Sequence, residues 1–295
     1  MNVTSNLTSI ETKAFYNCKN LTSIEIPSHV VSIGPYAFSG CQSLTSITIP
    51  SDVTIIDNNT FFGCTSLKTV NITSNLTSIA QHAFSGCKSL TSVEIPSSVR
   101  SIGSYAFQYC ESLKSITIPS GVTSINNNTF SECSNLKAVD ITSNLTSIGS
   151  YAFYNCKNLT SIEIPSSVES IGSFAFQYCE SLTSIIIPFD VTSIDNNAFY
   201  GCTSLKTVNF IAANLTSIGP YAFCNCKNLA SIIIPSSVKS IGSFAFSECS
   251  SLTSISIPSG VTTIDANVFS KCISLKTVNI TSNLTSIGNH ALNIA

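Results

Sequence analysis

The sequence predicts a solenoid of parallel β-strands, built from about twelve copies of one 23-residue repeat. Cysteines recur with this period, and a phenylalanine stands at the third position before each of them. In every copy, apolar residues then alternate with polar ones over a few positions, as in a half-buried strand. The repeat cysteines are Cys18, Cys41, Cys64, Cys87, Cys110, Cys133, Cys156, Cys179, Cys202, Cys226, Cys249 and Cys272.

Each repeat contains three predicted elements. Residues 21–27, LTSIEIP, predict a short strand whose two isoleucines lie on one face. Residues 30–33, VVSI, predict a second and shorter extended segment. Residues 36–41, YAFSGC, predict one turn of α-helix or 3-10 helix with alanine, phenylalanine and cysteine facing inward. Such a unit has three sides and must bury its apolar faces against neighbouring copies.

The length of the period lies within the range of about 20–29 residues that is typical of leucine-rich repeats. The L-x-x-I-x-I pattern of residues 21–26 also matches the strand of that repeat. Solenoids of this kind gain their stability from coupling between neighbouring repeats. We therefore predict a leucine-rich-repeat solenoid of parallel β-strands, with short second strands and short helical or 3-10 turns, forming a single domain over residues 1–295.

A longer period is superimposed on the repeat. The phrase VTSNLTSI at residues 3–10 recurs as ITSNLTSI at residues 72–79 and in near copies later in the chain. Its leucines mark 69-residue superblocks of three repeats, with one inserted residue before Leu215: Leu7, Leu76, Leu145, Leu215 and Leu284. This spacing indicates that a three-repeat unit was duplicated.

The composition excludes several classes of function. Only 9% of the 295 residues are charged and the formal net charge is -2, so no electrostatic attraction to nucleic acid is expected. No run of about 18 apolar residues could span a bilayer, and the first residues do not form a signal peptide. Serine, threonine and asparagine must cover most of the surface.

The pattern LTSIEIPSSVxSIGSYAFxxCxxLTSI resembles the BspA-type leucine-rich repeat of bacterial and protist surface proteins. The resemblance covers essentially the whole chain, because the Ile-Pro, SIG and AFxxC segments occur in order. It implies a right-handed solenoid that adheres to a host, matrix or cell-surface protein. It also implies a location at the cell surface or outside the cell, while a cytoplasmic location stays open without a signal peptide.

The candidate chemical groups do not predict catalysis. Stacked at one per repeat, the cysteines would lie about 4.8 Å apart with parallel side chains, which favours a buried ladder of free thiols over disulfides or zinc sites. Cys224 breaks the pattern and is either an exposed thiol or a tolerated substitution. His29, His82 and His290 do not form a metal site or a catalytic pair. We expect no enzymatic activity, no catalytic or metal-binding residue and no cofactor.

Glycosylation is an open alternative. The chain contains twelve Asn-x-Ser/Thr sequences, at Asn2, Asn6, Asn20, Asn58, Asn71, Asn75, Asn127, Asn144, Asn158, Asn214, Asn279 and Asn283. A chain rich in asparagine, serine and threonine also produces such sequences by chance. The sequence does not decide between the two explanations.

Outward positions of the first strand are the candidate binding residues. One column is almost uniformly small and hydroxylated, whereas the column two residues further along varies, and variation on a fixed scaffold is where recognition is encoded. The variable column contains Glu25, Thr48, Asn71, Glu94, Thr117, Asp140, Glu163, Ile186, Asn209, Ile233, Ser256 and Asn279. Ile186 and Ile233 are the least expected residues on a solvated face and are the first candidates for contact with a partner.

An alternative function is self-assembly. Solenoids need polar caps, but residues 1–10 already match an internal part of the repeat, and residues 286–295 form a degenerate half-repeat. Uncapped ends expose strand edges that pair with other chains. The sequence therefore predicts either a piece of a longer array or a homo-oligomer that stacks through its terminal repeats.

Overall fold

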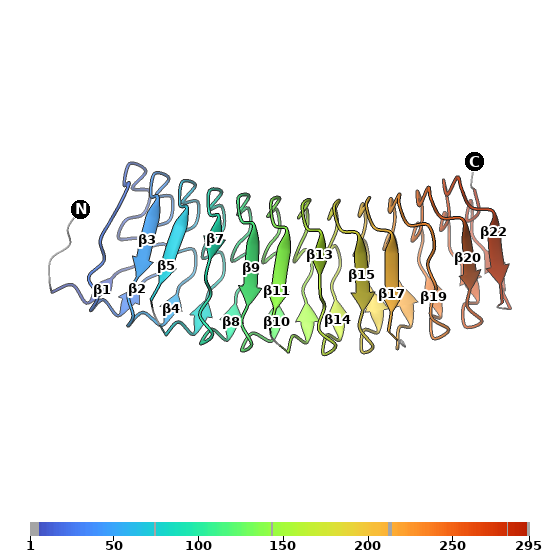
Figure 1. Cartoon of the computed structure of the whole chain (residues 1–295), viewed down its shortest axis with the longest axis horizontal. Helices are drawn as coiled ribbons and strands as arrows, with labels where there is room; N and C mark the ends of the chain where they lie inside the picture. Colours follow the sequence, from blue (N-terminus) through green and yellow to red (C-terminus); the bar gives the residue numbers. More distant parts are fainter. Residues whose placement is uncertain (1–5, 74, 143, 212–213, 282, 294–295) are drawn as a thin grey trace. The chain divides into compact units, whose positions relative to one another are not determined.

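The computed structural model describes residues 6–73, 75–142, 144–211, 214–281 and 283–293. The chain divides into two compact units, Met1–Leu145 and Thr146–Ala295, which are described separately below. Both units consist of parallel strands joined by turns (Figure 1). The solenoid of 23-residue repeats predicted from the sequence is confirmed, while its organisation as a single domain stays a prediction.

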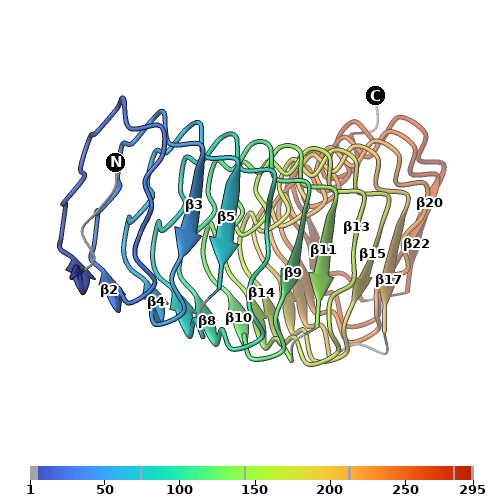
Figure 2. The same cartoon turned by 60° about the vertical axis from the view of Figure 1, so that its left-hand side comes forward.

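In unit 1, the first strands of the repeats lie beside one another and the second strands form a separate row (Figure 2). The strand predicted at residues 21–27 is reduced to a single bridge residue, Glu25. The first strands are β3 (Ser46–Ile49), β5 (Thr69–Ile72), β7 (Ser92–Val93), β9 (Ser115–Ile118) and β11 (Ala138–Ile141). The second strands are β1 (Ser9–Ile10), β2 (Ser32–Ile33), β4 (Ile55–Ile56), β6 (Ser78–Ile79), β8 (Ser101–Ile102) and β10 (Ser124–Ile125).

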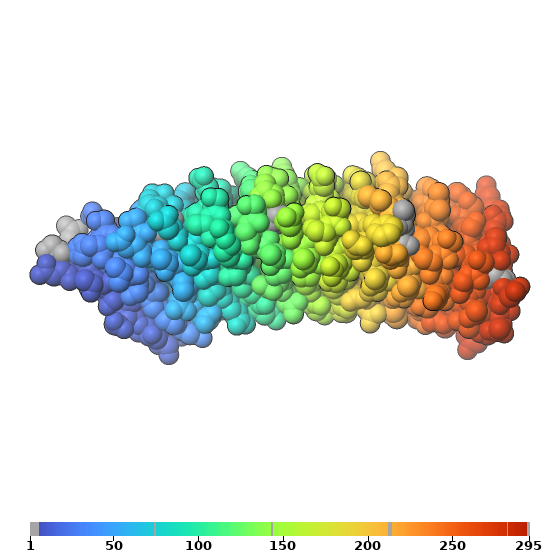
Figure 3. Space-filling model, turned by 90° about the horizontal axis from the view of Figure 1, so that it is seen from below, coloured from blue at the N-terminus to red at the C-terminus, as the bar shows by residue number. Residues whose placement is uncertain are grey.

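Unit 2 repeats this arrangement. Its first strands are β13 (Ser161–Ile162), β15 (Ser184–Ile187), β17 (Thr207–Phe210), β20 (Ser254–Ile257) and β22 (Thr277–Ile280). Its second strands are β12 (Ser147–Ile148), β14 (Ser170–Ile171), β16 (Ser193–Ile194), β18 (Ser217–Ile218), β19 (Ser240–Ile241), β21 (Thr263–Ile264) and β23 (Ser286–Ile287). In the space-filling view, the repeats of each unit adjoin one another as bands (Figure 3).

The inserted residue does not disturb the strand register. Ser184 of β15 pairs with Thr207 of β17, whereas Ser193 of β16 pairs with Ser217 of β18, so the second pair spans one residue more than the first. The extra residue is therefore accommodated between β17 and β18, outside both strands. A loop can absorb one residue, but a slip within a strand would turn every side chain to the opposite face.

The segment predicted as one turn of helix instead forms successive β-turns, and no helix occurs among the described residues. In residues 36–41, the amides of Ala37, Ser39 and Cys41 each donate to the carbonyl three residues earlier. The intervening amides of residues 36, 38 and 40 donate to the next repeat, at Asn58, Thr60 and Phe62. A continuous helix would need the amides of residues 36, 38 and 40 for hydrogen bonds within the segment. Here these amides donate to the next repeat and link neighbouring repeats of the stack.

Two residues of each such segment have a left-handed backbone. At residues 36–41 these are Tyr36 (φ 57°) and Gly40 (φ 76°), and both positions are left-handed wherever the later repeats are described. The second position carries glycine four times, at Gly40, Gly63, Gly86 and Gly201. Elsewhere larger residues occupy it at a conformational cost of roughly 1 kcal/mol each.

The core of each unit is a stack of identical side chains. Phenylalanine rings of neighbouring repeats lie nearly parallel, with centroids 5.1 Å apart between Phe15 and Phe38 and 5.2 Å apart between Phe153 and Phe176. Buried repeat thiols donate to the carbonyl of a phenylalanine in the preceding repeat, as Cys64 Sγ does to Phe38 O at 3.1 Å and Cys179 Sγ does to Phe153 O at 3.2 Å. The cysteines thus fill space and also tie neighbouring repeats together.

Of the residues described, no helix is long or apolar enough to cross a lipid bilayer.

Candidate binding surface

The outward residues of the first strands form the strand face of each unit. All twelve positions of the variable column, from Glu25 to Asn279, are exposed, as are the small residues two positions earlier in the same strands. The alternating pattern therefore placed these side chains correctly. Their part in binding stays a proposal.

Pairing across the strand face is interrupted once in each block of three repeats. The blocks begin at Leu21, Leu90, Leu159 and Leu229, and their second and third repeats pair over four residues, as β3 does with β5. The strand of the first repeat is shorter: β7 pairs with β5 over two residues only, and it lies in a different sheet from β9.

One main-chain hydrogen bond still joins the repeats at these breaks. Lys114 N donates to Thr91 O and Thr183 N donates to Thr160 O, each at 3.3 Å, the same length as the bond from Thr91 N to Lys68 O between the paired strands β5 and β7. The break therefore concerns the strand ladder after this bond, because β7 and β9, like β13 and β15, belong to different sheets.

A groove opens at two of these breaks, at equivalent places in successive blocks. In unit 1 a groove of about 450 Å³ lies between residues 92–95 and 115–117. In unit 2 the equivalent groove, of about 590 Å³, lies between residues 161–166 and 184–189 and is also lined by Ile211. We call these the unit 1 groove and the unit 2 groove.

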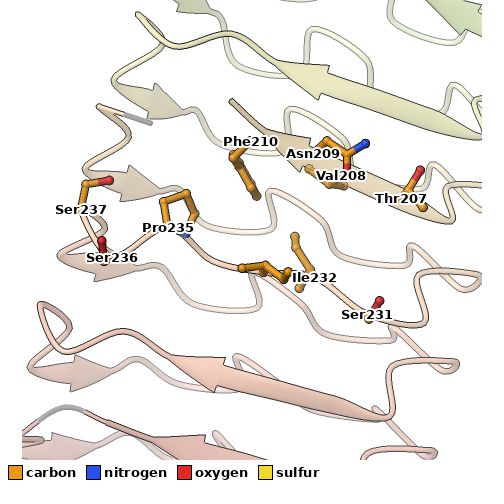
Figure 4. Close-up of a pocket in the computed structure, with 10 residues that line it drawn as sticks. Thr207, Val208, Asn209, Phe210, Ser231, Ile232, Pro235, Ser236 and Ser237 are labelled. Carbon is orange, nitrogen blue, oxygen red and sulfur yellow. The ribbon is translucent and has the colours of Figure 1, made fainter. Parts of the chain in front are cut away.

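A third groove of about 560 Å³ lies in unit 2 between residues 207–210 and 231–237 (Figure 4). Here the first repeat of the last block forms a single isolated bridge, between Ser231 and Ser254, and the opening lies on its other side, next to Asn209 and Phe210. Figure 4 shows Phe210, Ile232 and Pro235 around this opening.

The two equivalent grooves differ in the residues around them. Ile186, Phe189 and Ile211 of unit 2 are 47%, 45% and 52% exposed, and Ile233 beside the third groove is 86% exposed. We call these four residues the isoleucine patch. At the positions equivalent to Ile186, Phe189 and Ile211 in the preceding block, unit 1 carries three polar residues, Thr117, Ser120 and Thr142.

Phe189 and Ile211 were not predicted as site residues. Phe189 replaces the serine of the usual IPS segment, and Ile211 follows the phenylalanine of NFIAANL, where other blocks have threonine. A comparison of equivalent positions between blocks would have revealed both. They lie outside the alternating part of the strand, where that pattern makes no prediction.

Among the described lining residues, each of the two equivalent grooves contains one charged residue at the same position, Glu94 in unit 1 and Glu163 in unit 2. Both carboxylates are exposed. Neither forms one of the ion pairs found among the described residues, which join Lys88 to Glu111, Lys157 to Glu180 and Lys271 to Glu248.

The cysteines are free thiols, and from Cys41 onward they are buried, as predicted for a thiol ladder. Burial raises the pKa of Cys41 and of Cys272 to about 11 each. Cys224 is not an exposed thiol: it is buried, and its pKa rises to about 12 because of burial and the nearby Glu248 carboxylate. Cys18 is exposed and does not follow the buried pattern of the ladder.

The histidines are not all solvated. His82 is half-buried and stacks on Tyr105, with ring centroids 4.5 Å apart, while burial lowers its pKa. Its Nδ1 atom is buried without a hydrogen-bond partner. No group of three or more potential metal ligands occurs within the described ranges.

The asparagines of the Asn-x-Ser/Thr sequences are exposed at every described position, and Asn2 lies outside the described residues. Exposure leaves room for a glycan at each site. Whether any site is modified stays a prediction.

The comparisons with known proteins agree with this architecture. The model of the BspA type leucine rich repeat region matches residues 1–114, 100–212 and 169–294. A search of curated proteins finds no match.

Several solved structures are similar. A leucine-rich repeat protein from Bacteroides ovatus is 32% identical, with a TM-score of 0.60, over 90% of this chain and 81% of that one. A leucine rich cell surface protein from Faecalibacterium prausnitzii is 30% identical, with a TM-score of 0.50, over 95% and 89% of the two chains. The pneumococcal vaccine antigen PcpA is 20% identical and shares the fold, with a TM-score of 0.51 over 97% and 78%. The chain belongs to the BspA-type leucine-rich-repeat family.

Proposed function

We propose that this protein is a non-enzymatic interaction module that binds a host, matrix or cell-surface protein through its strand face. The observation that carries the proposal is the isoleucine patch of unit 2. Large apolar side chains gathered on an exposed surface are typical of interaction sites. The equivalent positions of unit 1 are polar, so the repeat itself does not require apolar residues there.

The composition of the strand face supports a protein partner. Small hydroxylated side chains such as Ser161, Ser184 and Thr207 are exposed in the same repeats, and Ser161 and Ser184 line the unit 2 groove. Protein interfaces commonly combine a few buried apolar anchors with a polar rim. Ile233, at 86% exposed, would serve as the most prominent anchor.

A location at the cell surface or outside the cell is part of the proposal. It is supported by the family and by the similar cell-surface protein of F. prausnitzii. Fractionation of the producing cells, with detection of this chain on intact cells, would test it. Detection only inside the cells would contradict this part.

Binding to a panel of purified matrix and cell-surface proteins tests the function. We expect at least one partner to bind the wild-type chain and to bind the double variant Ile186→Thr/Ile233→Thr at least tenfold more weakly, since interface anchors contribute about 2 kcal/mol or more. A matched control, Ile55→Thr/Phe62→Thr, removes two exposed apolar side chains elsewhere. Equal loss in both variants, or no partner at all, would count against the proposal.

Self-association is a second candidate. Ile280 and Ile287, in the last two strands described, are 44% and 51% exposed. A second copy or a further repeat would cover this surface. Sedimentation across micromolar concentrations separates the cases, because a strictly monomeric chain would remove self-assembly as a function.

A further inference from the structure

We infer that the unit 2 groove binds an extended peptide segment that carries a lysine or arginine side chain two positions from an apolar one, so that both face the groove. The inference rests on the proposed function and names the partner chemistry for one part of the strand face. Glu163 would receive the cationic group, while Ile186 and Phe189 would receive the apolar side chain.

Charge complementarity selects a cation. Of the described residues that line the unit 2 groove, Glu163 alone is charged, and it forms none of the ion pairs found in the described ranges. An exposed carboxylate beside apolar side chains favours a ligand group of opposite charge over a neutral or acidic one. The other lining residues that the structure describes are serines, isoleucines, prolines and one phenylalanine, so they add hydroxyl groups and no competing cation.

The geometry of the break favours an extended main chain. Strand β13 ends at Ile162, so Glu163 and Ile164 continue along the groove outside the strand. Peptides in extended conformation bind such segments with main-chain hydrogen bonds and present alternate side chains to the surface. The groove lies between β13 and β15, which belong to different sheets, so the edges of β13 and β15 that face each other carry no strand ladder.

The unit 1 groove provides an internal control. It has the same main-chain break and the same carboxylate, at Glu94, but Thr117 and Ser120 replace Ile186 and Phe189. It offers the charge without the apolar contacts. We therefore expect it to bind the same segment much more weakly.

Fluorescence anisotropy with synthetic peptides tests the inference on the full chain. The probe is a labelled peptide with the core Val-Thr-Lys-Thr-Val between Ser-Gly and Gly-Ser flanks, in which Lys and both valines share one face of the extended chain. The matched peptides carry Gln or Glu in place of Lys. We expect the Lys peptide to bind about threefold more tightly than the Gln peptide, as for an exposed ion pair. The Glu peptide should bind more weakly than both, and salt should reduce these differences.

Variants assign the effect to the groove. Glu163→Gln should remove the difference between the Lys and Gln peptides, whereas Glu94→Gln should leave it unchanged. Ile186→Thr/Phe189→Ser, which installs the unit 1 residues, should weaken all three peptides. These side chains are exposed, so circular dichroism should show unchanged folding.

The outcomes separate the two proposals. No binding of the Lys peptide at millimolar concentration, or a lysine preference that survives Glu163→Gln, would overturn the inference. If the panel partner still depends on Ile186 and Ile233 in that case, the proposed function stands and only the peptide chemistry is wrong. Loss of that dependence would overturn the proposed function itself.

Discussion

Replacement of Phe176 by alanine should destabilise unit 2 strongly. The Phe176 side chain is fully buried, and its ring stacks between Phe153 and Phe199 with centroids 5.2 Å and 5.3 Å away. Removing a buried phenylalanine costs about 3–5 kcal/mol. Loss of two aromatic contacts, each contributing about 0.5–1.5 kcal/mol, places the expected value at the upper end, near 5 kcal/mol.

Urea unfolding followed by circular dichroism measures this cost. The matched control is Phe189→Ala, in the same unit, whose side chain is 45% exposed and whose loss should change stability by about 0.5 kcal/mol or less. Because solenoid repeats couple mainly to their neighbours, amide hydrogen exchange should accelerate most in the repeats next to residue 176. A cost below about 1 kcal/mol for Phe176→Ala, or an equal cost for both variants, would refute the stacked-core account.

Four further predictions concern the thiols, His82 and the left-handed turns. With Ellman's reagent, only Cys18 should react quickly in the folded chain, and rapid reaction of Cys224 would contradict its burial. Burial raises the pKa of the buried thiols, so they stay protonated in the folded state while the thiols of the unfolded chain ionise. The free energy of unfolding should therefore be constant below about pH 9 and fall above it, by about 1.4 kcal/mol per pH unit for each thiol that is ionised only in the unfolded chain. A urea midpoint that does not change from pH 8 to 10 would argue against this. Burial lowers the pKa of His82, so its contribution to folding stability should be present above about pH 6.5 and decrease as the pH falls. His82→Phe should remove this pH dependence of stability, and an unchanged pH profile in the variant would contradict the assignment. Gly63 (φ 68°) has open space around a potential Cβ, so Gly63→Ala should destabilise the chain by about 1 kcal/mol through backbone strain alone. Gly63→Asn should destabilise it less in the same urea titration, because Asn155 adopts the left-handed backbone at the equivalent position of a later repeat. Equal losses of stability would disprove the conformational explanation.

Most of the fold could be predicted from periodicity. The spacing of the cysteines sets the repeat, and alternation in segments such as ITIP at 47–50 identifies the strand and its inward side. The segment at residues 36–41 was less predictable, because a single apolar turn fits a helix as well as successive β-turns. Only the stack shows that Phe38 N donates to Thr60 O in the next repeat.

The candidate site was predictable in part. Exposure of Ile186 and Ile233 follows from their place in the alternating strand. The grooves could not be predicted, because the loss of pairing between β7 and β9 depends on main-chain paths in neighbouring repeats. His82 was missed for a similar reason: its half-burial comes from Tyr105, which belongs to the next repeat.

Hydroxyl-radical footprinting of the chain with its panel partner tests the central claim most directly. The method labels exposed side chains, so Ile186, Phe189, Ile211 and Ile233 should be labelled in the free chain. In the complex, labelling of these four residues should fall by half or more, while Ile55 and Phe62 should stay labelled as before. Protection of Ile55 and Phe62 with the isoleucine patch still fully labelled would contradict binding through the strand face of unit 2.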